Sequence, residues 1–303
     1  MGEIAALATS LCWSLTSIQF TMASQRAGSR IVNRMRLLLA VLFLVVAHLV
    51  VHGTLWPRNV EPFRWGWLGL SGIIGLMLGD GALYQAFLLI GTHRSMLLMT
   101  LAPVISALLA WGWFGEQLQT VQIAAILLTM GGIAWVVSER REKESTDSGE
   151  NEPPKESRRY VWGVLCGIGG ALGQAVGLVL SKRGLTGGFD PLSATLVRMI
   201  VATGIMWLIA LLQGQAGKTV RTMSETKAWT ATIGGALTGP AIGVWFSMLA
   251  IQHAQVGIAS TLMSLSPIML IPLSRWFFGE HATPRSVAGT AVAMAGATVL
   301  FLT

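Results

Sequence analysis

Charged residues are scarce in this chain of 303 residues. Asp, Glu, Lys and Arg make up 12% of it, roughly half of the 25% or so that is typical of a soluble domain. Tyrosine is also rare, with 2 residues against 12 tryptophans. The shortage of charge excludes an ordinary soluble globular domain.

Acidic residues are fewer than basic ones, which gives a formal net charge of +7. The basic residues fall between apolar segments, where they set membrane topology, so we expect no nucleic-acid partner. Cysteine is nearly absent: Cys12 and Cys166 lie in separate apolar segments and lack metal-ligand spacing. The five histidines form no metal-spaced set either. We therefore expect no disulfide framework, no metal and no cofactor.

Catalytic motifs are missing as well. No nucleophile–base pair and no phosphate-binding loop can be assembled from the sequence. We expect the chain not to be an enzyme, and an intramembrane enzyme would need a convergent set of His, Asp or Ser. An ATP-driven pump would need a soluble nucleotide-binding domain, for which the chain has no room.

Apolar residues are what the chain has in abundance, at 53% of the sequence. They form runs of roughly 20 residues, each long enough to cross a bilayer of about 30 Å as a helix. We predict an all-α integral membrane protein with ten transmembrane helices. The predicted helices cover residues 3–23, 35–52, 66–90, 95–114, 121–138, 161–181, 192–212, 229–252, 258–278 and 286–302.

The segment 139–160 differs from all the others. It is rich in charge, contains Pro153-Pro154 and has almost no apolar residues, as is typical of flexible linkers. We predict a domain of five helices at 1–138, this linker, and a second domain of five helices at 161–303.

The two predicted domains are copies of one unit. Residues 101–116 read LAPVISALLAWGWFGE, and residues 265–280 read LSPIMLIPLSRWFFGE, with a constant offset of 164. A unit of five helices is odd, so the second copy must cross the membrane in the opposite sense. The sequence therefore predicts inverted repeats around a central cavity, which is typical of secondary transporters.

Orientation follows from the Lys and Arg residues between the predicted helices. Counting Arg36 with the loop before it, 15 of the 21 lie in loops on the side of the linker, and 4 lie in loops on the other side. The positive-inside rule places the linker in the cytoplasm and both termini outside.

The order of these features resembles the EamA family of the drug/metabolite transporter superfamily. Each unit has an arginine early in its second helix, Arg36 or Arg198, and later a proline followed by Phe-Gly-Glu. The resemblance covers nearly the whole chain except the linker. It implies a bacterial inner-membrane carrier that exports amino acids, metabolites or toxic compounds. It also implies termini in the cytoplasm, opposite to the charge count.

Polar residues on the first and sixth predicted helices are candidates to line the cavity. Ser10, Ser14, Ser17 and Thr21 share one face of the first helix. Gln174 lies on the matching face of the sixth helix, although small residues on such a face can also serve close helix packing. We favour cavity lining for Ser14 and Gln174, and Trp13 could supply an aromatic wall or face lipid.

Asp80 is the strongest single candidate. A carboxylate midway along a predicted membrane helix costs about 2.5–3.5 kcal/mol on insertion scales. It should therefore face a water-filled cavity, pair with a cation or be protonated. Its counterpart in the second copy is Val244, so the repeated fold does not require it. Tyr84, one turn along, shares its face. We predict that Asp80 binds substrate or couples transport to protons.

The remaining candidates fall into two sets. The predicted substrate-binding residues are Trp13, Ser14, Ser17, Asp80, Tyr84, Thr100, Gln174 and Ser264. The predicted structural or gating residues are Arg36, Pro103, Glu116, Arg198, Pro267 and Glu280. We expect the two arginines to reach the lipid phosphates from their helix ends.

The function predicted from these features is secondary transport of small organic metabolites by alternating access. The predicted direction is efflux across the plasma membrane, either by proton antiport or by facilitated diffusion. The alternative is a membrane scaffold or sensor that transports nothing, whose polar residues should lie at the surface. The expected partners are a small-molecule substrate and the lipid bilayer, with the chain as a monomer or a weak homodimer.

Overall fold

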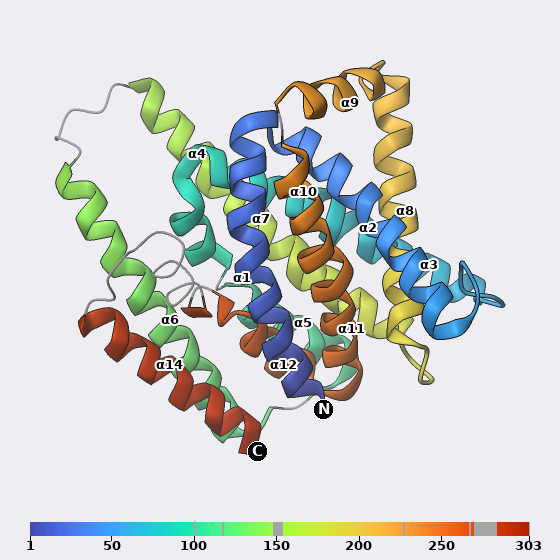
Figure 1. Cartoon of the computed structure of the whole chain (residues 1–303). Helices are drawn as coiled ribbons and strands as arrows, with labels where there is room; N and C mark the ends of the chain where they lie inside the picture. Colours follow the sequence, from blue (N-terminus) through green and yellow to red (C-terminus); the bar gives the residue numbers. More distant parts are fainter. Residues whose placement is uncertain are drawn as a thin grey trace.

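The computed structural model describes residues 1–99, 101–116, 118–147, 154–226, 228–266, 268–269 and 284–302. Over these ranges the chain is helical and contains no strand (Figure 1). The first half contains α1 (Gly2–Ala27), α2 (Ser29–His52), α3 (Pro62–Ser71), η1 (Gly72–Gly79), α4 (Asp80–Met99), α5 (Leu101–Phe114) and α6 (Thr120–Asp147). The second half contains α7 (Pro154–Gly184), α8 (Pro191–Leu212), α9 (Ala216–Glu225), α10 (Trp229–Ala236), η2 (Leu237–Gly243), α11 (Val244–His253), α12 (Val256–Met263) and α14 (Pro284–Leu302).

Six helical stretches among the described residues are long and apolar enough to cross a membrane. They are Gly2–Ala27, Ser29–His52, Pro62–Gly91, Arg159–Gly184, Pro191–Leu212 and Trp229–His253. Two shorter apolar helices, Leu101–Phe114 and Thr120–Gly132, lie where the fourth and fifth helices were predicted. The all-helical membrane architecture is confirmed, and the count of ten stays a prediction.

Several helix ends differ from the predicted ones. Helix α2 begins at Ser29 rather than 35, which places Arg36 two turns inside it. Helix α6 runs to Asp147 and α7 begins at Pro154, so both enter the predicted linker 139–160. The Glu, Lys and Arg residues of that segment are good helix formers, and only 148–153 of the segment lies outside the described residues.

The third span of each half contains the same irregularity. Segments η1 and η2 are π-helical, and they end at Gly79 and Gly243, which are 164 residues apart. Such i→i+5 turns are rare and occur often at functional sites. Asp80 and its counterpart Val244 each follow directly after a π-helical segment, so the carboxylate sits at a position where the helix is locally widened.

The two halves pack on each other in a crossed pattern. The α4 and η1 segments of the first half pack on α7, while α10, η2 and α11 of the second half pack on α1. Corresponding helices also meet directly, α2 with α8 and α6 with α14, the last pair at one edge of the molecule (Figure 1). Glycines allow the crossed contacts, since a methyl group on Gly173 would lie 2.6 Å from the Cα of Gly79.

Candidate functional site

A cavity of about 110 Å³ lies between the two halves. Residues of α1, α2, η1, α4 and α5 line one part of it, and residues of α7, η2, α11 and α12 line the rest. The lining includes six of the predicted substrate-binding residues: Trp13, Ser17, Asp80, Tyr84, Gln174 and Ser264. Thr100, another candidate, lies outside the described residues.

Asp80 forms an ion pair with Arg36 in the cavity wall. The Arg36 Nη2 donates to Asp80 Oδ2 at 2.6 Å and also to the carbonyl oxygen of Leu76 at 2.8 Å. Its Nε donates to Asn33 Oδ1 at 2.7 Å. The Arg36 side chain is 2% exposed and that of Asp80 is 19% exposed, so the carboxylate is the member of the pair that the cavity can reach.

Aromatic rings complete the surroundings of Arg36. Its guanidinium carbon lies 5.0 Å from the ring centre of Tyr84 and 5.7 Å from that of Phe20. Contacts of this kind stabilise a desolvated cation by about 2 kcal/mol. Arg36 is therefore held by one carboxylate, one amide, one carbonyl and two rings, and the prediction that it reaches lipid phosphates is wrong.

Ser14 is a correction to the predicted lining. Its hydroxyl donates to the carbonyl oxygens of Ser10 at 2.7 Å and Ser266 at 2.8 Å, and the Ser266 hydroxyl donates back to the Ser10 carbonyl at 3.0 Å. Ser14 is fully buried. These bonds join α1 to the segment after α12, so the small residues of this face serve helix packing as well as the cavity.

Arg198 occupies the position in α8 that Arg36 has in α2, but its environment differs. It is 3% exposed, its Nη1 lies 3.1 Å from the Sδ of Met248, and its Nε has no hydrogen-bond partner among the described residues. No carboxylate pairs with it in that part of the chain, since Val244 stands where Asp80 stands in the first half. The prediction that Arg198 reaches the lipid phosphates is also wrong.

Comparison with known protein families shows which family the chain belongs to. The model of the EamA-like transporter family matches residues 1–138 and 161–302, which is most of the chain. The chain belongs to the EamA-like transporter family. Members of this family are membrane transporters rather than enzymes, and this chain is accordingly a multi-pass membrane protein.

A solved structure described only as "Crystal structure of protein" has the same fold. It superposes with a TM-score of 0.75 at 17% sequence identity, covering 99% of this chain and 96% of the other. No curated protein matches the sequence. At this identity the similarity shows the fold alone and says nothing about a substrate.

Some lining residues of this EamA protein were missed by the sequence analysis. Met96, Met99 and Met263 line the cavity together with Phe87, and Thr16 adds a hydroxyl that lies 2.7 Å from that of Thr238. Methionines adapt their shape easily and suit surfaces that must fit several ligands. A methionine in a hydrophobic run gives no sequence signal of its own, so only the fold could reveal it.

Of the other predicted structural residues, Glu116 joins neighbouring helices. Glu116 forms an ion pair with Lys182 at 2.6 Å and accepts a hydrogen bond from the backbone N–H of Val256, the first residue of α12, at 3.1 Å. Pro103 is buried in the first turn of α5, where a missing N–H costs little. Pro267 and Glu280 lie outside the described residues.

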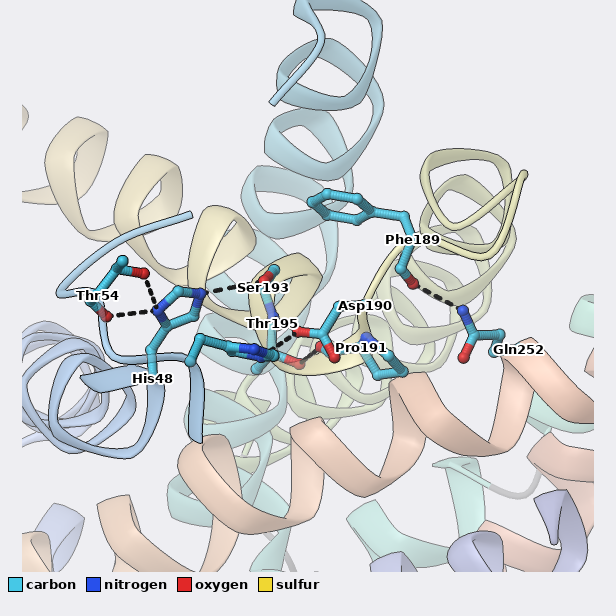
Figure 2. A network of polar contacts seen from close by, with 9 residues as sticks. His48, Thr54, Phe189, Asp190, Pro191, Ser193, Thr195 and Gln252 are labelled. Carbon is cyan, nitrogen blue, oxygen red and sulfur yellow. Dashed lines mark hydrogen bonds and ion pairs between the residues drawn. The ribbon is translucent and has the colours of Figure 1, made fainter. Parts of the chain in front are cut away.

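A second polar network joins the end of α2 to the start of α8 (Figure 2). His48 lies 2.6 Å from the carbonyl oxygen of Thr54 and 3.1 Å from the hydroxyl of Ser193. Asp190 accepts from the Ser193 N–H at 2.8 Å and pairs with His52 at 3.0 Å. Because α2 and α8 are corresponding helices, this network fastens the two halves to each other away from the cavity.

We predict that Asp190→Ala lowers the free energy of unfolding by about 1 kcal/mol. Asp190 is the N-cap of α8, and loss of such a cap costs about 0.5–2 kcal/mol. Thermal unfolding in detergent measures it. Asp190→Asn is the matched control, because Asn caps equally well, and it should unfold like the wild type. Equal losses in both variants would assign the effect to the contact of the carboxylate with His52 instead.

Proposed function

We propose that this chain is a secondary transporter that exports small organic metabolites, such as amino acids or drug-like compounds, across a bacterial inner membrane. The observation that carries the proposal is the cavity between the two halves, with the Arg36–Asp80 ion pair in its wall. A buried ion pair is costly to maintain in a membrane and marks substrate or ion pathways there.

The proposed mechanism is alternating access by two inverted repeats of five helices each. The crossed packing supports this arrangement: the third span of each half packs on the first span of the other. A two-fold relation in the membrane plane requires such an exchange. The two halves would then rock around the cavity, opening it to one side of the membrane at a time.

Asp80 is the proposed coupling residue. It is more exposed to the cavity than Arg36, so a proton or a cationic group of the substrate can reach its carboxylate. Either would compete with Arg36 for Asp80. Loss of the ion pair would leave Arg36 in the cavity wall without its counter-charge. Binding of a proton or substrate at Asp80 would therefore weaken the contact between α2, which carries Arg36, and α4, which carries Asp80.

The cavity walls favour small solutes with one polar and one apolar end. The ion pair, Gln174 and Ser264 supply the polar part, and Trp13, Tyr84 and the methionines supply the apolar part. The volume of about 110 Å³ is below the 300–1,000 Å³ or so of ligand pockets. A larger solute would therefore need the halves to separate, as alternating access requires.

Resistance of cells to toxic compounds tests the proposed export. A strain that overproduces the protein should tolerate at least one compound in a panel of toxic amino acids, amino-acid analogues and drugs. The same strain with Asp80→Asn at an equal membrane level should not. No tolerance to any compound would favour a scaffold or sensor. Equal tolerance with Asp80→Asn would leave export standing and remove Asp80 from its mechanism.

A further inference from the structure

The structure contains a second, larger recess that the transport proposal does not use. It has a volume of about 820 Å³ and lies among α2, η1, α4, α7, α8 and α9. Helix α4 separates it from the central cavity: Asp80 and Tyr84 face the cavity, whereas Gly81 and Gln85 line the recess. The recess is therefore a distinct site on the other side of the same helix.

Three cations gather at one end of this recess. Arg30 and Arg34 lie one turn apart on α2, and Lys218 belongs to α9. Like charges four residues apart on a helix repel each other, and no ion pair is found for any of the three within the described ranges. No acidic residue lines the recess. An anion would relieve the repulsion.

The position of these cations is built into the fold. The Arg34 guanidinium donates to Gln215 at 2.8 Å and to Thr219 at 3.2 Å, which fixes α9 against α2. Helix α9 lies across the end of α8 (Figure 1), as an amphipathic helix at a membrane interface does. Arg30 and Lys218 are exposed and make no hydrogen bond or ion pair in the described part of the chain, so both can turn to a ligand.

Apart from Ser29, Asn33 and Gln85, the rest of the recess is largely apolar. Leu78 and Trp162 line it and are 56% and 59% exposed, and Leu88, Met206 and Ile209 lie with them. Large apolar side chains left open on a membrane helix are suited to acyl chains. The recess thus has a cationic end beside an interfacial helix and an apolar body along the membrane spans, which is the polarity of one anionic phospholipid.

We infer that this recess binds an anionic phospholipid, with its phosphate at Arg30, Arg34 and Lys218 and its acyl chains along the apolar body. The inference is independent of what the protein transports. Arg34 positions the phosphate because its own bonds hold it in place, whereas Arg30 and Lys218 provide most of the charge that the phosphate can approach.

Native mass spectrometry of the purified chain with added lipid tests this site. We expect dioleoylphosphatidylglycerol to bind at one molecule per chain and more tightly than dioleoylphosphatidylcholine. The double variant Arg30→Gln/Lys218→Gln should bind phosphatidylglycerol about 30-fold more weakly, since each cation near a headgroup contributes roughly fivefold. Both positions are exposed, so thermal unfolding should stay unchanged and show that the variant is folded.

Two controls make the result decisive. Arg26→Gln/Arg221→Gln removes the same charge from the same end of the molecule but outside the recess, and it should change the affinity less than about twofold. An equal loss in this control would show general attraction to a basic surface and overturn the site. Glycerol phosphate in excess should not displace the lipid; complete displacement would assign the cations to a soluble phosphate instead.

Discussion

Replacing Asp80 with Asn should lower the free energy of unfolding by about 3–5 kcal/mol. The substitution removes the counter-charge of Arg36, whose side chain is 2% exposed. Breaking a buried ion pair on one side costs this much because the remaining charge stays desolvated. The loss can be measured by thermal or chemical unfolding of the purified protein in detergent.

A second variant separates the structural role of this pair from its role in transport. Arg36→Leu/Asp80→Asn removes both charges, and replacing both members of a buried pair is often neutral. We expect this double variant to regain most of the stability and still not to transport. Glu225→Gln is the control for loss of an exposed carboxylate, since Glu225 is 60% exposed in its pair with Arg221, and its stability should be unchanged. A single Asp80→Asn variant as stable as the wild type would contradict the role of the pair.

Replacing Gly173 with Ala should destabilise the contact between the halves by about 1–3 kcal/mol. The added methyl group would lie 2.6 Å from the Cα of Gly79 and 3.0 Å from the carbonyl oxygen of Ile74. Both are backbone atoms, so η1 and α7 would have to move apart. The midpoint of thermal unfolding in detergent should fall accordingly.

Gly169 provides the control on the same helix. A methyl group there would lie 3.7 Å from the Cβ of Ala82, an ordinary contact. Gly169→Ala should leave stability unchanged or raise it by up to about 1 kcal/mol, because alanine is the better helix former. Similar losses in the two variants would show that helix propensity, rather than the approach of the two halves, sets the effect.

Much of this arrangement could be predicted from the sequence, because it depends on composition and repetition. The constant offset of 164 predicted the two repeated units, and the apolar runs predicted the membrane helices. The cost of a carboxylate in a membrane singled out Asp80, and the helical period put Tyr84 beside it. The structure brings both together with Gln174 of the other half.

The partner of Asp80 could not be predicted in the same way. The basic residues Arg30 and Arg34 suggest a loop before 35, but Arg34 is held by Gln215 and Thr219, 181 and 185 residues away in sequence. This tertiary contact lets α2 begin at Ser29 and places Arg36 beside Asp80. The π-helical turns of η1 and η2 were not predicted either, although both segments end in a glycine at the same offset of 164.

The central claim is that Asp80 governs transport through the cavity between the halves. The most direct measurement is uptake of a compound identified by the resistance panel into proteoliposomes that contain the purified protein, with and without a pH gradient. We expect the wild type to transport the compound and to respond to the gradient, and Asp80→Asn to do neither. An Asp80→Asn variant that transports at the wild-type rate and still responds to the gradient would contradict the claim.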